Sequence, residues 1–171
     1  MYRGLRGHSM INAFQNIRNF YWKINLRLQG IRFGRGLVLM PLSHIYQGNG
    51  RIAIGNNFST NRNVVLNADG GGEIIIGNDV SIGCNTVIRA ANHDYVTRRG
   101  HIPGKIAIAD NVWIGANAVI LPGVHIGARS AIGAGSIVTK DIPADVVAVG
   151  NPCKPIKKIA PPDLSSSDGS D

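Results

Sequence analysis

The sequence lacks the features of a disulfide-stapled, secreted or membrane-spanning chain. Its two cysteines, Cys84 and Cys153, form neither a disulfide framework nor the spacing of a metal site. The basic N-terminal residues are not followed by an apolar segment, and no run of residues is apolar for long enough to span a bilayer. We therefore expect no signal peptide, no transmembrane span, and the cytoplasm as the compartment.

Acidic residues are also scarce, and none precedes Asp69, although nine Lys and Arg residues do. Over the whole chain, 18 Lys and Arg against 10 Asp and Glu give a net charge of +8. Such a charge favours anionic partners, but a solvated basic surface explains it equally well. Because the basic residues are not interleaved with aromatic ones, we expect no nucleic-acid partner.

Aliphatic residues, in contrast, recur at every sixth position, and the longest run comprises Ile108, Ile114, Ile120, Ile126, Ile132 and Val138. A helix would repeat near 3.6 residues and a strand at 2, so a period of six indicates a short strand followed by a tight turn. Three such units close a triangular coil of about 18 residues, and stacked coils pair their strands in parallel. Residues 31–160 therefore predict an all-β fold, a parallel β-helix with one continuous core.

The repeat is interrupted twice. Residues 67–73 form a small glycine-rich excursion, and residues 89–105 are a long insertion. Long loops on a rigid scaffold often carry function, so we expect the active residues near the insertion. The corners of the regular coils need residues that tolerate left-handed backbone angles, and suitable candidates are Asn78, Asn85, Asn111 and Asn117.

Two further segments flank the repeats. Residues 1–30 are basic and carry apolar residues at helical spacing, the last of which are Tyr21, Ile24 and Leu28. They predict a helical lead-in that either caps the first open coil or makes a weak contact with an anionic surface, such as the inner membrane surface. Residues 161–171 are polar and predict a disordered tail.

The motifs VWIG, GAGSIVTKDIP and GNPCK within residues 111–159, and Asn92-His93-Asp94-Tyr95 in the insertion, resemble the hexapeptide-repeat acyltransferases. The resemblance is to the galactoside/maltose O-acetyltransferase branch, while residues 25–36 are more similar to capsular and exopolysaccharide O-acetyltransferases. It implies a left-handed β-helix and a homotrimer with active sites between neighbouring subunits. It also implies acetyl-CoA as co-substrate, no metal, and a hydroxyl of a sugar or glycan precursor as acceptor.

His93 is the candidate catalytic residue. Acetyl transfer to a hydroxyl needs a base, the pKa of free histidine lies near working pH, and the family uses a histidine in this loop. Either Asp94 or a backbone carbonyl is expected to orient its ring. The resemblance places Asn61 against the reacting acceptor and Asp69 on sugar hydroxyls, although Asn61 is equally well explained as a corner residue with a left-handed backbone.

The resemblance also assigns the coenzyme A groove. Small residues would let the pantetheine arm approach the coil, and a threonine and two lysines would lie near the nucleotide and its phosphates. The residues at these positions are Gly115, Ala116, Gly133, Ala134, Thr139, Lys140 and Lys154. Trp113 is interpreted as a packing residue at a subunit or loop boundary.

Three alternative functions remain open. An N-acyltransferase acting on an amino sugar or amino acid would use the same fold and co-substrate. A metal enzyme of the carbonic anhydrase type needs three converging histidines, and the five histidines of this chain show no such constellation. A non-catalytic β-helix scaffold would leave His93 without a role.

Overall fold

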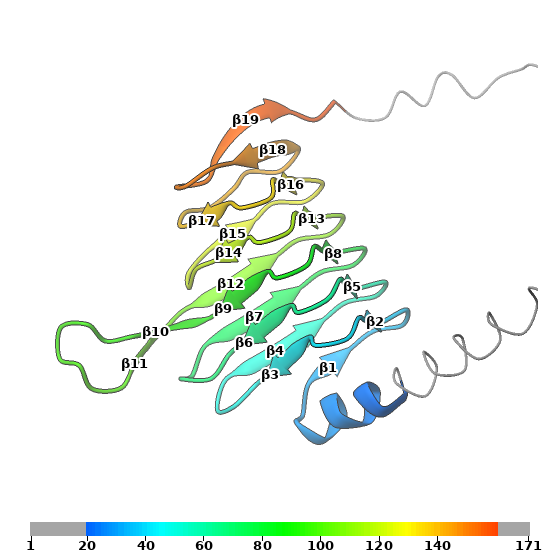
Figure 1. Ribbon diagram of the computed structural model, residues 1–171, viewed down its shortest axis with the longest axis vertical. Helices are drawn as coiled ribbons and strands as arrows, with labels where there is room; N and C mark the ends of the chain where they lie inside the picture. The colour runs from blue at the N-terminus through cyan, green and yellow to red at the C-terminus, as the bar shows by residue number, and fades with distance from the viewer. Residues whose placement is uncertain (1–19, 161–171) are drawn as a thin grey trace, which may run out of the picture.

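The computed structural model describes residues 20–160, which form a prism of stacked triangular coils (Figure 1). The chain winds through three sheets in turn. Sheet A contains β1 (Arg32–Phe33), β4 (Arg51–Ile54), β7 (Glu73–Ile76), β12 (Lys105–Ile108) and β15 (His125–Ile126). Sheet B contains β2 (Val38–Leu39), β5 (Ser59–Thr60), β8 (Ser81–Ile82), β13 (Trp113–Ile114), β16 (Ala131–Ile132), β18 (Val146–Val149) and β19 (Lys154–Lys158). Sheet C contains β3 (His44–Tyr46), β6 (Val65–Asn67), β9 (Val87–Arg89), β14 (Val119–Ile120) and β17 (Ile137–Val138).

The strands within each sheet pair in parallel, except that β19 runs antiparallel to β18. Ile108 pairs with Ile126, so a regular coil takes 18 residues, as the period of six predicts. The parallel β-helix expected from the sequence is therefore confirmed. We call the two prism edges that matter below the B–C edge, where the chain passes from sheet B to sheet C, and the C–A edge, where it passes from sheet C to the next strand of sheet A.

The core is a column of aliphatic side chains that runs the length of the prism. The repeating residues are buried, from Ile108, at 2% exposure, to Ile132 and Val138, at 0%. The side chains two positions earlier, such as Val112 and Ala118, are buried as well, because alternate residues of a strand share a face. Since replacing a buried Ile by Ala typically costs about 2–5 kcal/mol, this column holds the coils rigidly in register.

Asparagine ladders stabilise the corners. Asn63 Nδ2 donates to Asn85 Oδ1 at 3.1 Å, and Asn85 Nδ2 donates to Asn117 Oδ1 at 3.2 Å. All three residues have a positive φ, between 56° and 57°. The corner role predicted for Asn85, Asn111 and Asn117 is thus confirmed, but at the remaining predicted corner the left-handed residue is Asp79 rather than Asn78.

A short helix covers residues 20–28 and is part of the lead-in predicted over residues 1–30. Leu26 is fully buried and Trp22 packs against the core, which agrees with a cap on the first coil. The predicted apolar residues Tyr21, Ile24 and Leu28 instead face solvent, since they are 64%, 42% and 82% exposed. The helix therefore packs through a different face than its spacing suggests.

Some expectations fall on segments that the structure does not describe. The first part of the lead-in lies in residues 1–19, and the predicted tail lies in residues 161–171, and both are outside the described residues. Within residues 20–160, no helix is long and apolar enough to cross a membrane.

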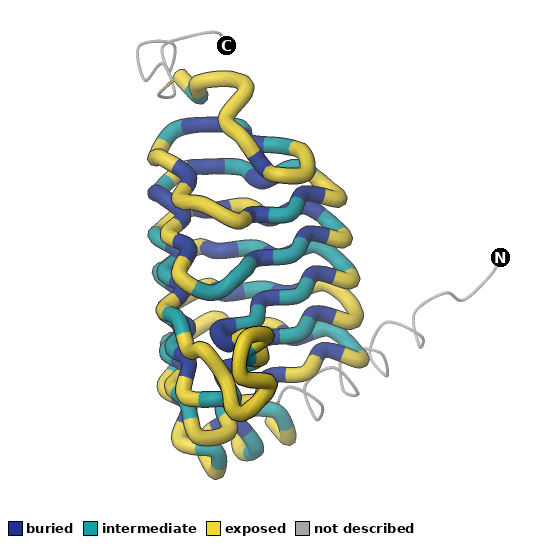
Figure 2. Tube along the Cα trace, turned by 90° about the vertical axis from the view of Figure 1, so that its left-hand side faces the viewer, coloured by how far each residue is buried: buried dark blue, intermediate teal, exposed yellow. Residues whose placement is uncertain are grey.

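The two interruptions of the repeat lie one coil apart on the C–A edge. The excursion at residues 67–73 forms a turn between β6 and β7. The insertion folds into a two-stranded antiparallel hairpin, β10 (Ala91–His93) and β11 (His101–Pro103), which projects from the coil (Figure 1). Figure 2 shows the hairpin as an exposed loop in front of the stacked coils.

Candidate active site

The hairpin holds His93 at the end of β10, where the side chain is exposed. His93 lies opposite His101 in the strand pairing, and the two imidazole centroids are 4.6 Å apart with an interplanar angle of 35°. Because side chains alternate along a strand, both histidines lie on one face of the hairpin, and Asn92 and Ile102 lie on the other. The candidate base is therefore packed against a second imidazole.

Asp94 serves the hairpin turn. Its carboxylate accepts hydrogen bonds from the Val96 N–H at 2.9 Å, the Thr97 N–H at 3.0 Å and the Thr97 hydroxyl at 2.5 Å. The Thr97 hydroxyl bond, assisted by the two backbone N–H groups, lowers the pKa of Asp94. Among the hydrogen bonds of the described residues, none joins Asp94 to His93, so the structure does not favour Asp94 as the group that orients the base.

Asp69 lies in the glycine-rich turn of the same edge and is half-buried. Its backbone N–H donates to Asn67 Oδ1 at 2.8 Å, and the next two N–H groups, of Gly70 and Gly71, donate to Asn49 Oδ1 at 2.7 and 2.9 Å. These bonds fix the turn beneath the hairpin. Asp69 and His93 are thus brought to one edge of the prism, in consecutive coils.

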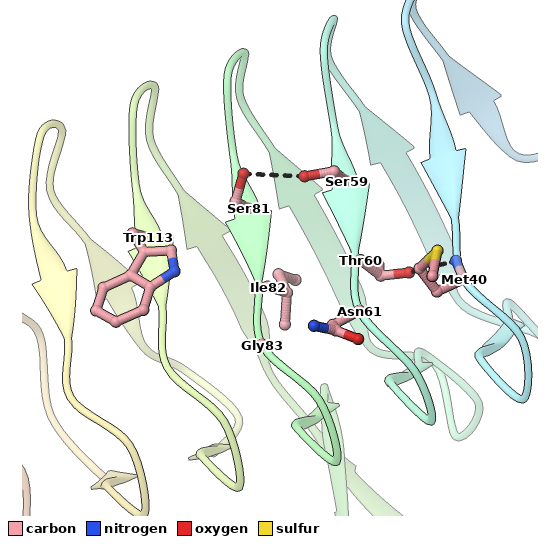
Figure 3. A pocket seen from close by; sticks show the side chains of 8 residues that line it. All are labelled: Met40, Ser59, Thr60, Asn61, Ser81, Ile82, Gly83 and Trp113. Atoms are coloured by element: carbon pink, nitrogen blue, oxygen red, sulfur yellow. Dashed lines mark hydrogen bonds between the residues drawn. The ribbon is translucent and has the colours of Figure 1, made fainter. Parts of the chain in front are cut away.

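A hollow of about 370 Å³ lies on the outer face of sheet B. Figure 3 shows the side chains that surround it, which come from four neighbouring strands and the turns that follow them. They are Met40, Ser59, Thr60, Asn61, Ser81, Ile82, Gly83 and Trp113. The hollow combines an indole, a thioether, a hydroxyl pair whose oxygens lie 2.9 Å apart, and an amide, which together suit a ligand with both apolar and polar parts.

Asn61 is the predicted site residue in this hollow. Its Oδ1 accepts the Arg62 N–H at 2.7 Å, and its exposed side chain lies at the carboxyl end of β5 (Figure 3). The left-handed backbone at this corner belongs to Asn63, with a φ of 56°, and Asn61 is not among the residues with positive φ. The alternative explanation of Asn61 as a left-handed corner residue is therefore wrong.

The small residues assigned to coenzyme A continue along the B–C edge above Asn61. Gly115 is buried, and a Cβ there would lie 2.5 Å from the Ala134 nitrogen of the next coil. A Cβ on Gly133 would lie 2.6 Å from Val149 Cγ1. Gly115 is thus required for close stacking of the coils whether or not a ligand binds, whereas a side chain at Gly133 would displace the side chain of Val149. Ala116 is half-buried and Ala134 is exposed, so these two present surface to a ligand.

The two predicted lysines lie on different edges. Lys154 begins β19 and pairs with Val149, which places it at the top of the B–C edge. Thr139 and Lys140 are exposed in the turn that leaves β17, which belongs to the C–A edge. One prism therefore carries two groups of predicted site residues. Asn61, Gly115, Ala116, Gly133, Ala134 and Lys154 follow the B–C edge, and Asp69, His93, Thr139 and Lys140 follow the C–A edge.

Sequence reasoning missed most of the hollow on sheet B. Trp113, interpreted as a packing residue, is 55% exposed and lines the hollow together with Met40. The available signal was its position: Trp113 directly precedes the inward-facing Ile114, so strand alternation turns the indole outward. Nothing in the sequence pattern links Trp113 to Met40, because they come from strands that are not consecutive in the chain.

A second hollow of about 350 Å³ lies on the far face of the hairpin, opposite the histidines. It is lined by Asn92, Tyr95, Ile102, Pro103, Gly104, Pro122 and Gly123. Elsewhere in the described part of the chain, Cys84 and Cys153 are both free, and residues 20–160 contain no group of three or more His, Cys, Asp or Glu side chains that could hold a metal ion.

Comparisons of the sequence with known proteins show similarity to hexapeptide-repeat transferases. Residues 105–140 match the bacterial transferase hexapeptide family (six repeats). A relative from Saccharomyces cerevisiae is 43% identical over 121 residues, which are 68% of this chain and 60% of the relative. The chain covers less of other curated relatives, for example 31% of the galactoside O-acetyltransferase of Lactococcus lactis, to which it is 55% identical over 64 residues.

Solved structures extend the similarity to most of the chain. A maltose O-acetyltransferase from Clostridium difficile has 34% identity and a TM-score of 0.60, over 80% of this chain and 73% of that protein. A hexapeptide-repeat acetyltransferase of Vibrio cholerae, in complex with acetyl-CoA, has 26% identity and a TM-score of 0.62, over 94% of both chains. The repeats and these neighbours agree with the left-handed β-helix that the resemblance implied.

Proposed function

Because this chain belongs to the hexapeptide-repeat transferase family, we propose that it moves an acetyl group from acetyl-CoA to a hydroxyl of a sugar or polysaccharide precursor. The observation that carries the proposal is the ordered hairpin that presents the exposed His93 from a rigid coil. Two named neighbours support it, since one is a maltose O-acetyltransferase and the other binds acetyl-CoA.

His93 is the general base of the proposed reaction. Its imidazole takes the proton of the acceptor hydroxyl while the hydroxyl oxygen attacks the thioester carbonyl. The new C–O bond forms, the C–S bond breaks, and the proton passes to the departing sulfur of coenzyme A. The products are an acetyl ester and free coenzyme A, so no oxidant, reductant or metal enters the balance.

Asn61 is the proposed partner of the reacting groups. An amide N–H that points to the developing oxyanion stabilises the transition state more than the ground state. The Asn61 Oδ1 is held by the Arg62 N–H, which leaves the amide nitrogen as the group available for a donated bond. Asp69 lies on the same C–A edge as the hairpin, and we propose that it binds the other hydroxyls of the acceptor.

We place coenzyme A along the B–C edge. Ala116 and Ala134 offer small exposed surface to the pantetheine arm, and Lys154 at the top of the edge offers a cation to a phosphate. Lys140 and Thr139 take the same nucleotide from the C–A edge of another subunit. The acetyl group then reaches the hollow that contains Asn61 and Trp113.

We propose a homotrimer, which the separation of the two edges supports. His93 and Asn61 lie on different edges of one prism, with sheet C between them. A site that uses both residues needs the C–A edge of one copy against the B–C edge of another, and such head-to-tail contacts close into a ring. The hairpin tip, where Tyr95 and Val96 are 81% and 76% exposed, supplies apolar surface for this contact.

Acetyl-CoA as co-substrate favours the cytoplasm as the site of the proposed reaction. The exposed Tyr21, Ile24 and Leu28 of the helix lie beside Lys23 and Arg27, which supports a weak contact with an anionic membrane surface that holds glycan precursors. Co-sedimentation with vesicles that contain anionic lipid, and not with neutral vesicles, would support that contact. Equal sedimentation with both would leave only the capping role.

The activity is tested by release of free thiol from acetyl-CoA across a panel of sugars, nucleotide-sugars and amino sugars. We expect turnover with a hydroxyl acceptor and a product that gains one acetyl group by mass spectrometry. Hydroxylamine cleaves an acetyl ester but leaves an acetyl amide, so the same product distinguishes O-acetylation from N-acetylation. Turnover confined to amines would replace the proposal by the N-acyltransferase alternative, and no transfer to any acceptor would favour the scaffold.

A further inference from the structure

His93 and His101 form a cross-strand pair of the kind in which the two side chains approach each other most closely. The Gly104 N–H donates to the Ala90 carbonyl at 2.7 Å, and the Asp94 N–H donates to the Gly100 carbonyl at 3.3 Å. Hydrogen-bonded and non-hydrogen-bonded pairs alternate along an antiparallel ladder. Because Asp94 and Gly100 form a hydrogen-bonded pair, the adjacent His93–His101 pair is of the non-hydrogen-bonded kind. Side chains approach more closely at such pairs, which agrees with the 4.6 Å between the ring centroids.

The turn below the hairpin forms a seat for His101. Gly70 has a φ of +88°, and a Cβ placed on it would lie 2.8 Å from Cγ and 2.9 Å from Cβ of His101, and 3.0 Å from Cβ of Ala91. Gly70 is therefore a position where the His101 side chain packs directly on backbone. The turn itself is fixed, because the Gly70 and Gly71 N–H groups both donate to Asn49 Oδ1.

These contacts connect the rigid coil to the exposed base. His101 packs on the Gly70 turn with the root of its side chain and on the ring of His93 with its own ring. The carboxylate of Asp94, the residue that follows His93, is occupied by the hairpin turn. We infer that His101 is a positioning residue, seated on Gly70, that holds the His93 imidazole in its reactive orientation.

The inference rests on the proposed function, in which His93 is the general base. An exposed side chain loses rotamer freedom when a neighbour packs on it, and a base displaced by about 1 Å can lose on the order of 10²-fold in rate. As a positioning residue, His101 would contribute a flat ring for His93 to pack against, and it would not donate or accept a proton. His101→Phe keeps the ring and removes both nitrogens, whereas His101→Ala removes the ring.

We expect His101→Ala to lower kcat about tenfold or more, with little change in the KM for acetyl-CoA or for the acceptor. His101→Phe should stay within about threefold of the wild-type kcat. Equal losses in the two variants would overturn the positioning role, because they would assign the effect to the imidazole nitrogens. Unchanged kcat in both variants would overturn it as well.

Gly70 offers an independent test with a matched control. Gly70→Ala places a methyl group against the His101 side chain and should reproduce the loss of kcat seen in His101→Ala. Gly71→Ala imposes the same kind of backbone strain, at a φ of +83°, but its Cβ would meet only Pro103 Cβ at 3.9 Å. It should retain the wild-type kcat, and equal losses at both glycines would contradict a specific role for the seat of His101.

A readout that needs no turnover separates this inference from the proposed function. The NMR signals of the His93 ring should shift on His101→Ala, since the ring current of the neighbouring side chain is lost, whereas His101→Phe should keep a ring current on them. If the wild type transfers no acetyl group, the proposed function fails while the ring signals still report the packing. Ring signals that are unchanged in His101→Ala would overturn the positioning role regardless of activity.

Discussion

At the scale of single residues, His93 is the general base of the proposed acetyl transfer. Removing a positioned general base typically lowers the rate 10²–10⁴-fold, so His93→Ala should lose about that much in kcat. Acetyl-CoA binding should survive, because the exposed His93 side chain is not part of the core. Steady-state kinetics together with calorimetric titration of acetyl-CoA checks both points. More than about a tenth of wild-type kcat under saturating substrates would remove the general-base role.

The lysines are expected to act on coenzyme A alone. Lys154→Ala and Lys140→Ala should each raise the apparent constant for acetyl-CoA and leave that for the acceptor nearly unchanged. One lost contact to a phosphate corresponds to about 1–3 kcal/mol, or roughly 5- to 150-fold. Initial rates with each substrate varied in turn measure the split. Lys157→Ala, three residues along β19, is the matched control, and an effect on the acceptor instead would contradict the assignment.

The asparagine ladder makes a separate prediction about stability. Asn85 donates to Asn117, accepts from Asn63, and adopts a φ of 57°. Asn85→Ala loses both bonds and also strains the backbone, whereas Asn85→Gly loses the bonds but keeps an easy left-handed conformation. We expect Ala to destabilise the fold by about 1–3 kcal/mol in denaturant unfolding and Gly by less. Equal losses would show that the left-handed angle contributes nothing.

At the scale of elements, the hairpin turn should depend on the charge of Asp94. Hydrogen bonds from Thr97 and Val96 lower the pKa of Asp94 below its ordinary value of 3.8. The carboxylate therefore holds the turn at all pH values above 3.8, and this contribution is lost as the pH falls below that value through the lowered pKa. The amide signals of Val96 and Thr97 should move in this range. Asp94→Asn, which cannot titrate, should abolish the movement, and its persistence would assign it to another group.

The regular elements follow from the sequence, and the irregular ones do not. Ile108 and Ile126 repeat in a fixed phase, so burial and register could be predicted from their spacing alone. The insertion breaks that phase, and its pairing depends on a turn set by Asp94 and Thr97, which no repeat specifies. The contact between His101 and His93 therefore could not be predicted, although His93 itself could be identified from the motif that surrounds it.

The lead-in helix is a second case in which the sequence predicts an element but not its packing. Helical spacing predicts a helical lead-in over residues 1–30, and the described part of it is helical over residues 20–28, but the spacing does not say which face meets the prism. Leu26 is buried at the end of the core, whereas Tyr21 and Leu28 remain exposed. Tertiary packing here overrides the apolar stripe.

At the scale of the whole molecule, the candidate site residues lie on two separate edges of the prism. The β-helix stacks equivalent corners into straight edges, and this geometry keeps Asn61 and His93 on separate edges of one prism. No movement of a side chain can join them across sheet C. Sequence motifs identify both residues but cannot report their separation, since that depends on how many strands lie between them in each coil. We therefore propose that the two residues meet in a site shared between copies of the chain.

Subunit complementation tests whether His93 and Asn61 act in one site from neighbouring subunits. His93→Ala and Asn61→Ala proteins, each nearly inactive alone, would be unfolded together, refolded in equal amounts and assayed for acetyl transfer. In randomly mixed trimers, about a quarter of the sites would combine an intact His93 from one subunit with an intact Asn61 from its neighbour. A site shared between subunits should therefore restore about a quarter of wild-type activity. Activity no greater than the mean of the two single variants, in verified mixed trimers, would contradict it.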